Sequence, residues 1–413
     1  MRLNKFIGDS FLMILSSGIA QVILIITTPI ITRLYSPTEF GEFTIFSNIA
    51  MILIPIINAR YDLLIVNTKN DRSANILSQI SFLISLLILL ILIPIFAISA
   101  CLYPNFILDF IFIIIMLFLV SLTNIFTNYL NKERKYKVLS LINVFRAGSM
   151  ALLQIIFGLL ALGSLGLIIG FSLSYIAGIT TLGYKTFKKH FNIVRDKEET
   201  KALFLENKNQ LVYSTPSILL NSLSFSVVVF FIGILYTNTE VGIYGMAIRV
   251  LGIPVTIISL GLSKIFMQQA NDYYIEHGNF RNLLLKFSSI LVIVSIILYV
   301  PLYLFSEELV NILLGHSWVD AITVIKIVIP LFVIRLIVST VSLSVIVLQK
   351  QQLELILQAL FLIGTTATFV ISKMLNLTFL NFVSINTIVL IVSYMIFFIA
   401  LYYFAKNKQF KNS

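Results

Sequence analysis

Long stretches without a charged residue constrain this chain more than any other feature of its sequence. Residues 10–32, 73–108 and 374–405 are three of them. A helix crosses a bilayer with about 20 mostly apolar residues, so each stretch is long enough to span one. Charged residues make up only 11% of the chain and hydrophobic residues 59%, which excludes an ordinary soluble domain and a disordered chain. The sequence therefore predicts an all-α polytopic membrane protein.

Applied along the whole chain, the same criterion predicts about 12 transmembrane helices. The further charge-free stretches are 43–59, 110–131, 147–184, 209–239, 287–306 and 355–372. Three spans carry embedded basic residues, and they lie at roughly 138–160, 242–262 and 321–346. No small-residue cleavage site follows the first span, so we interpret it as an uncleaved membrane anchor.

Basic residues are concentrated in alternate loops. With the N-terminus placed in the cytoplasm, 23 of the 29 Lys and Arg residues fall on the inside, two fall outside and four lie within spans. This bias predicts a multi-pass membrane protein with both termini cytoplasmic. The net charge of +11 therefore reflects topology and attraction to anionic lipid heads, and nucleic acid is not an expected partner.

Several chemistries have no support in the sequence. The predicted outer loops are short, which argues against a polysaccharide polymerase or ligase with an external active site. The chain has one cysteine and three histidines, and His190, His277 and His316 fall in loops, so we expect no disulfide and no metal site. We find no nucleophile–base pair and no phosphate-binding glycine loop. The sequence predicts a protein that is not an enzyme and has no cofactor.

A short motif occurs twice in the chain. Residues 34–43 and 235–244 align at an offset of 201, with Leu, Tyr, Thr, Glu and Gly in the same places. Each copy has Ser or Thr three residues before Glu, the spacing of a capping box that starts a helix. Two unrelated turns of one common type are the alternative, and we favour a duplicated six-helix half. Parallel repeats of this kind occur in transporters.

The repeat predicts the domain organisation. We expect an N-terminal six-helix lobe at 1–184, a cytoplasmic linker at 185–210 and a C-terminal six-helix lobe at 211–413. The linker is the longest predicted inside loop, and it is rich in charge. The aromatic residues Trp318, Tyr35 and Tyr103 lie near predicted span ends, where we interpret them as part of the interface belt.

The motifs together resemble the Wzx-type polysaccharide flippases of bacteria. The resemblance rests on residues 34–43, RYDLLIV at 60–66, YLNK at 129–132, VGIYGMA at 241–247 and LGHSW at 314–318. Each motif is weak by itself, but their order and spacing are specific, and they cover nearly the whole chain. The resemblance implies the multidrug/oligosaccharidyl-lipid/polysaccharide exporter superfamily, with two six-helix lobes that form a V-shaped central cavity.

The resemblance also implies a function. Such a protein translocates undecaprenyl-pyrophosphate-linked oligosaccharide, the repeat unit of O-antigen or capsule, from the inner to the outer leaflet. The implied partners are this polyprenyl-pyrophosphate-linked glycan, membrane lipids, a polysaccharide polymerase and a chain-length regulator. The motifs do not identify the glycan or the energy source. An exporter of another anion or a drug is one alternative, and the polymerase or ligase enzyme is the other.

Four basic residues lie within the predicted spans: Arg146, Arg249, Lys326 and Arg335. Ionisable side chains at membrane depth are costly and usually face a cavity. The spans hold almost no acid, so a basic interior favours an anionic ligand, and Arg binds pyrophosphate through a bidentate fork. We therefore predict that these four residues bind the substrate.

Helical spacing separates the four candidates. The three arginines share a face with small or polar residues, although such faces also mediate helix packing. Lys326 precedes Arg335 by nine residues, which is about half a turn around an ideal helix. The two can face one cavity only if Pro330 breaks the helix, and snorkelling to the outer interface is the alternative for Lys326. Arg60 and Asp62 are interpreted as interface charges at the inner end of span two.

Overall fold

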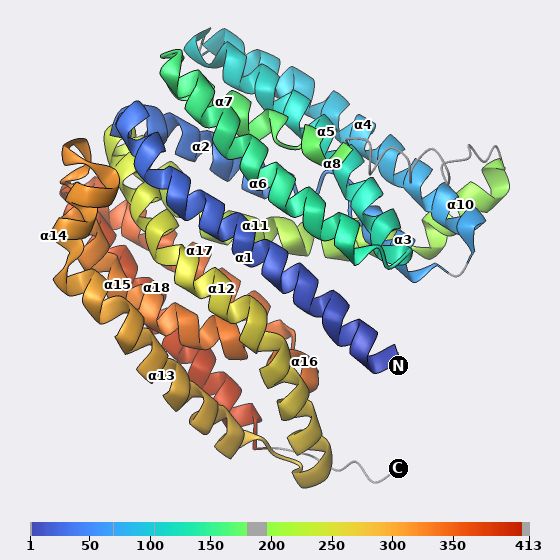
Figure 1. Cartoon of the computed structure of the whole chain (residues 1–413). Helices are drawn as coiled ribbons and strands as arrows, with labels where there is room; N and C mark the ends of the chain where they lie inside the picture. Colours follow the sequence, from blue (N-terminus) through green and yellow to red (C-terminus); the bar gives the residue numbers. More distant parts are fainter. Residues whose placement is uncertain (1, 69, 103, 180–195, 407–413) are drawn as a thin grey trace. The chain divides into compact units, whose positions relative to one another are not determined.

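The computed structural model describes residues 2–68, 70–102, 104–179 and 196–406. Over these residues the chain is helical throughout, without a strand (Figure 1). Ten of the described helical segments are long and apolar enough to cross a membrane, and a shorter apolar segment covers Ser164–Ile179. The predicted all-α polytopic fold is confirmed, and this set is consistent with about 12 spans.

The helices follow the predicted spans closely. The long helices of the first half are α1 (Arg2–Leu34), α4 (Asp71–Leu102), α5 (Ile107–Lys132) and α6 (Tyr136–Leu159). Those of the second half are α11 (Thr215–Leu235), α12 (Asn238–His277), α13 (Arg281–Leu304), α15 (Ala321–Val341), α17 (Gln352–Leu375) and α18 (Phe379–Phe404). The shorter helices are α2 (Pro37–Leu53), α3 (Tyr61–Asn67), α7 (Ser164–Leu173), α8 (Ile176–Ile179), α10 (Lys197–Glu206), α14 (Ser306–Leu309) and α16 (Ser344–Val347).

The chain forms two compact units. The first contains Met1–Tyr35 and Glu42–Ser226, and the second contains Ser36–Gly41 and Val227–Ser413. In the first unit α1 packs along α6, and α4 packs on α5 with α3 beside both. In the second unit α15 packs against α12, α13 and α18. The predicted lobe boundaries at 184 and 211 stay a prediction, and much of the predicted linker lies outside the described residues.

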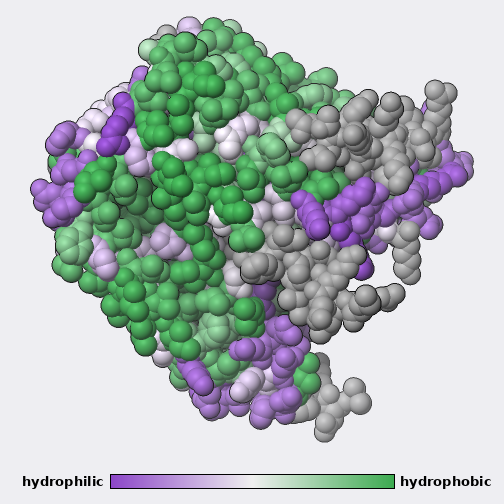
Figure 2. All heavy atoms as spheres, in the orientation of Figure 1, coloured by the Kyte–Doolittle hydropathy of each residue, from purple (hydrophilic) through white to green (hydrophobic). Residues whose placement is uncertain are grey.

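The surface has the character expected of a protein in lipid. Apolar side chains cover much of the face shown in Figure 2, and hydrophilic residues gather around α10. Large apolar side chains such as Leu90 and Met374 are exposed on the long helices. A soluble protein rarely exposes apolar patches of this extent, so these surfaces face hydrocarbon.

Both predicted capping boxes are present. The Ser36 and Thr237 hydroxyls accept the backbone N–H groups of Glu39 and Glu240 at 3.3 and 3.5 Å. The two glutamates in turn accept the backbone N–H groups of Ser36 and Thr237 at 2.7 and 2.8 Å. These bonds satisfy helix N–H groups that have no partner inside the helix, so α2 and α12 begin where the repeat predicts.

The repeated glycines bring these two helix starts into backbone contact inside the second unit. A Cβ atom on Gly41 would lie 1.8 Å from the backbone oxygen of Asn238. A Cβ atom on Gly242 would lie 1.9 Å from the backbone oxygen of Pro37. Beside them, the Thr38 hydroxyl lies 2.7 Å from that of its repeat counterpart. Only glycine permits so close an approach, which explains why the motif keeps glycine in both copies.

The repeated tyrosines occupy matching places in the two units. The Tyr35 hydroxyl donates to the Gln154 carbonyl on α6 at 2.6 Å. The Tyr236 hydroxyl donates to the Leu377 carbonyl, between α17 and α18, at 3.0 Å. Each tyrosine thus joins the end of the first helix of its repeat to a later helical segment of the chain.

The interface-belt interpretation is wrong for two of its three aromatic residues. Tyr35 is only 2% exposed, and Trp318 is fully buried with its ring against Phe40 at 5.6 Å. Tyr103 lies outside the described residues. Aromatic residues near span ends are therefore packing residues here, because the helix crossings at these ends need large side chains.

Candidate anion-binding site

Arg249 lies on α12 in the second unit with part of its guanidinium buried. The guanidinium carbon lies 5.7 Å from the centre of the Phe40 ring, a cation–π contact. Its Nη2 atom is buried and has no hydrogen-bond partner among the described residues. A buried donor without an acceptor is costly, and an anion with free oxygen atoms would supply the missing acceptor.

Arg335 lies on α15 and is half-buried, with its guanidinium carbon 5.4 Å from the centre of the Phe332 ring. The Phe332 ring in turn lies 6.5 Å from the ring of Tyr299 on α13. The α13, α15 and α18 segments contain no Asp or Glu, and α12 carries acids only near its ends. The arginine therefore lies beside aromatic rings, which the sequence pattern did not predict.

Arg146 differs from these two because it lies on the first unit and is exposed. Its guanidinium carbon lies 4.8 Å from the centre of the Tyr175 ring. It forms no ion pair with any residue that the structure describes. An exposed arginine within a span is expected to face water or an anionic ligand.

Lys326 is separated from Arg335 by the geometry of α15. The helix runs without a break from Ala321 to Val341, with Pro330 inside it, so the condition under which both residues could face one cavity is not met. The two basic side chains therefore leave the helix on opposite faces. The Lys326 ammonium lies 5.9 Å from the centre of the Tyr303 ring, near the end of α13. This contact favours the interface interpretation, and substrate binding by Lys326 stays a prediction.

Part of each predicted polar face is used for helix packing. The Ser259 hydroxyl on α12 lies 2.9 Å from that of Ser339 and 3.1 Å from that of Thr340, both on α15. Gln154 is fully buried, and its side-chain amide donates to the Leu167 carbonyl on α7 at 3.1 Å. Small polar residues commonly join helices in this way, so these positions are not part of the candidate site.

Asp62 is the charged residue that sequence reasoning placed wrongly. It lies inside the first unit, 7% exposed, rather than at a surface. Asn128 donates to its carboxylate at 3.0 Å, and Asn124 donates to Asn58 at 3.0 Å. Asn124 and Asn128 are four residues apart on α5 and share one face of that helix, and they meet Asn58 in the turn before α3 and Asp62 in its first turn. That shared spacing was the available signal.

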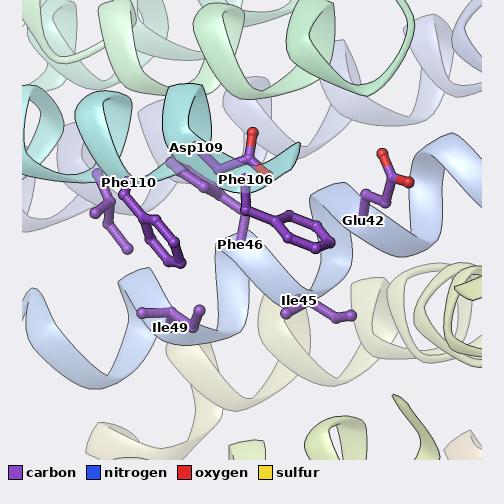
Figure 3. A pocket seen from close by; sticks show the side chains of 8 residues that line it. Glu42, Ile45, Phe46, Ile49, Phe106, Asp109 and Phe110 are labelled. Carbon is purple, nitrogen blue, oxygen red and sulfur yellow. The ribbon is translucent and has the colours of Figure 1, made fainter. Parts of the chain in front are cut away.

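The first unit also has a pocket that does not suit an anion. It lies between α2 and the start of α5 and has a volume of about 260 Å³. Figure 3 shows aromatic rings around it and the carboxylates of Glu42 and Asp109 nearby. The lining residues are Glu42, Ile45, Phe46, Ile49, Phe106, Asp109, Phe110 and Ile113. Because the lining has no basic residue, the pocket is separate from the candidate site.

The long apolar helices define a multi-pass membrane protein with basic residues within its spans. The chain belongs to the family described as polysaccharide biosynthesis protein, whose model matches residues 30–323. This confirms the resemblance to polysaccharide and lipid-linked flippases.

Solved structures of transporters share the fold. The lipid II flippase MurJ in an inward closed conformation aligns with a TM-score of 0.70 at 13% identity, covering 94% of this chain and 86% of that chain. An inward-facing multidrug resistance MATE family transporter of the MOP superfamily aligns with a TM-score of 0.65 at 16% identity, covering 95% and 93%. The MATE transporter VcmN of Vibrio cholerae aligns at 0.56 and 13%, covering 98% and 96%. No curated protein sequence matches the chain.

Proposed function

We propose that this protein moves a lipid-linked oligosaccharide with a pyrophosphate group, such as an O-antigen or capsule repeat unit, across the bacterial inner membrane. Its substrate is then a polyprenyl-pyrophosphate-linked glycan used in lipopolysaccharide or capsule synthesis. A polymerase and a chain-length regulator would act on the product after translocation. The protein itself carries out no covalent chemistry in this scheme.

The observation that carries the proposal is the buried, unpartnered Nη2 of Arg249 in a polysaccharide biosynthesis family member. A pyrophosphate offers several acceptor oxygens and two or more negative charges, and Arg recognises such groups through paired N–H donors. Arg335 and Arg146 supply further positive charge within the spans. The polyprenyl tail needs no polar site because it stays in lipid.

Translocation requires that the bound head group be released on the other side of the membrane. Parallel repeats of transporters achieve this by alternating access. The Tyr35 and Tyr236 hydrogen bonds fix helices within the first and the second unit respectively, and the two capping-box turns stabilise the second unit. The proposed direction is from the cytoplasmic to the outer leaflet.

The orientation follows the positive-inside bias and can be tested directly. Single cysteines placed at residues 36–38 or 311–317 should react with an impermeant thiol reagent in intact cells, after Cys101 is replaced by Ser. Cysteines at residues 196–205, on and beside α10, should react only after the cells are opened. Labelling of residues 196–205 from outside would reverse the topology.

The binding role is tested by complementation of a flippase-deficient strain. We expect Arg249→Ala and Arg335→Ala to lower surface polysaccharide by about tenfold or more, since a charged hydrogen bond contributes about 1.5–3 kcal/mol. Membrane levels of both variants should stay near wild type, because each change removes a buried charge. Arg→Lys should retain part of the activity, since it keeps the charge but loses the fork.

Arg281→Ala is the matched control. Arg281 also stacks on an aromatic ring of the second unit, Tyr402 at 3.8 Å, but it lies at the start of α13. This variant should complement normally at equal protein level, and Lys326→Ala should have a mild effect. If Arg249→Ala and Arg335→Ala both restore normal polysaccharide, the proposed mechanism is wrong. Export of a small anion or a drug by purified protein would favour that alternative.

A further inference from the structure

The aromatic pair Phe40 and Trp318 comes from sequence motifs that lie far apart in the chain. Phe40 belongs to the first copy of the repeat, at 34–43, and Trp318 ends the motif at 314–318. Phe40 is 2% exposed and Trp318 is fully buried. Both residues belong to the second unit, as Arg249 does, so the contacts among them lie inside one compact unit.

Two contacts connect Trp318 to Arg249 through Phe40. The Trp318 and Phe40 rings meet edge to face, with centroids 5.6 Å apart and an interplanar angle of 82°. The Arg249 guanidinium carbon lies over the Phe40 ring, 5.7 Å from its centre, which is within the range of a cation–π contact. The ring thus restrains the guanidinium without accepting a hydrogen bond, and the buried Nη2 atom has no partner among the described residues.

The backbone around Phe40 keeps its ring in place. The Phe40 N–H group donates to the Ser36 carbonyl at 3.0 Å in the first turn of α2. The capping box between Ser36 and Glu39 fixes the start of this turn. The next residue, Gly41, lies so close to the Asn238 backbone that a Cβ atom has no room. The ring is therefore held at its backbone and, by the tryptophan, at its edge.

The aromatic side chain at this position is a departure from the repeat. At the offset of 201, Phe40 corresponds to Val241 in the second copy. Arg249 corresponds at the same offset to Asn48. Neither counterpart has an aromatic ring or a charge, so the repeated turn itself does not require a phenylalanine. The ring and the arginine occur together at one of the two equivalent places only.

We propose that Phe40 is a positioning residue, which holds the Arg249 guanidinium by a cation–π contact and so keeps its Nη2 donor available to a phosphate oxygen of the substrate. The inference deepens the proposed function and rests on it. It gives the repeat motif a role in anion binding and leaves the contact with the substrate to the arginine.

An aromatic ring suits this task better than a carboxylate would. An arginine side chain loses conformational freedom when it binds an anion, and a guanidinium held in place beforehand loses less. A carboxylate would also hold the guanidinium, but it would occupy the N–H donors and neutralise the charge. The Phe40 ring attracts the cation through its face and has no acceptor oxygen, so the charge and the donors remain for the ligand.

The test is calorimetric titration of purified protein in nanodiscs with inorganic pyrophosphate as the probe. Pyrophosphate has no apolar surface, so Phe40 can affect its binding only through another residue. We expect Phe40→Leu to weaken binding by roughly three- to tenfold, because the cation–π contact is lost. A trifluorinated phenylalanine at position 40 nearly keeps the shape of the ring but removes the negative charge of its face. It should weaken binding by a similar factor while the melting temperature stays near wild type.

Phe266→Leu is the matched control. Phe266 is also fully buried in the second unit, on α12, with its ring 5.0 Å from the Phe287 ring and 6.4 Å from the Phe280 ring. This variant should lower the melting temperature about as much as Phe40→Leu does, and it should bind pyrophosphate with wild-type affinity. An equal loss of affinity in Phe266→Leu would mean that loosened packing is the cause, and it would overturn the inference.

The outcomes separate this inference from the proposed function. If Arg249→Ala loses pyrophosphate binding while the trifluorinated protein binds as wild type does, the cation–π role is wrong and the proposed function stands. If Arg249→Ala and both Phe40 variants bind weakly, but Arg249→Ala and Phe40→Leu complement normally, the aromatic support exists and the flippase proposal fails. No binding by the wild-type protein, or equal binding by Arg249→Ala, would overturn the inference.

A second arm identifies the source of the phosphate. Nanodiscs of zwitterionic phosphatidylcholine are compared with nanodiscs that contain anionic phosphatidylglycerol. Equal pyrophosphate affinity in both supports a site reserved for the substrate head group. A large loss of affinity in phosphatidylglycerol would assign the Arg249 site to bulk lipid and overturn the role of Phe40 in substrate binding.

Discussion

The first unit buries amide groups and one carboxylate, whereas the second unit places guanidinium groups against aromatic rings. In the first, Asn128 is bonded to Asp62 and Asn124 to Asn58. In the second, Arg249 lies over the Phe40 ring, and its buried Nη2 atom has no hydrogen-bond partner among the described residues. Satisfied polar groups stabilise a fold, and unsatisfied ones are available to a ligand. The two repeated helix starts are thus alike, while the interiors of the two units differ in chemistry.

The largest expected effect tests whether the two repeated turns remain equivalent. Gly41→Ala and Gly242→Ala each place a Cβ atom within 2 Å of a backbone oxygen, so we expect each to cost about 3 kcal/mol or more. Both variants should fail to accumulate in the membrane to a similar extent. Gly261→Ala is the control, since a Cβ atom there has no neighbour within 4 Å. A large loss at only one of the first two positions would break the equivalence.

The second prediction compares one substitution in the interior of each unit. Asp62→Ala removes one of the two acceptors of the Asn128 amide, the other being the Asn124 carbonyl, and should lower stability by about 1–3 kcal/mol. Arg335→Ala should leave stability nearly unchanged and remove transport. The measurements are the melting temperature in detergent and surface polysaccharide at matched protein level. If Asp62→Ala is as stable as wild type, the buried network is not structural and the contrast between the units disappears.

A smaller effect concerns the shared tyrosine anchors. Tyr35→Phe and Tyr236→Phe each remove one hydrogen bond to a carbonyl. Each should lower the free energy of unfolding by about 1 kcal/mol, with the larger loss at Tyr35 because its acceptor is more deeply buried. Parallel thermal denaturation of the two variants measures this difference. A larger loss of stability in Tyr236→Phe than in Tyr35→Phe would contradict this order and show that the anchors have diverged.

The smallest effect is expected at the surface of the first unit. Arg72 binds Asp196 at 3.0 Å and Glu199 at 2.7 Å, which holds α10 beside the start of α4. Exposed ion pairs contribute at most about 1 kcal/mol, so Arg72→Ala should barely change the melting temperature. Hydrogen exchange of residues 197–206 should nevertheless rise, and high salt should have the same effect on wild type. Unchanged exchange would mean that the Tyr61–Phe204 stack, with ring centroids 5.6 Å apart, is sufficient to hold the helix.

Much of the local structure could be predicted because its causes are local. Spans depend on the hydropathy of about 20 consecutive residues, and a capping box depends on residues three apart. The start of α12 could therefore be placed within a few residues. The end of α12 at His277 could not be predicted from hydropathy, because the helix continues well beyond the predicted span. Gly278, in a left-handed conformation, ends it.

The roles of polar residues at membrane depth were decided by tertiary structure. The sequence determined that Arg249, Arg335, Ser259 and Asp62 lie in or near spans, because hydropathy and position are properties of the chain itself. Only the packing of distant helices decided that Ser259 joins α12 to α15 and that Asp62 is buried beside α5. The same packing placed the Phe40 ring against the Arg249 guanidinium. Whether a buried polar group has a hydrogen-bond partner depends on residues far away in sequence, and no local sequence pattern indicates which residues those are.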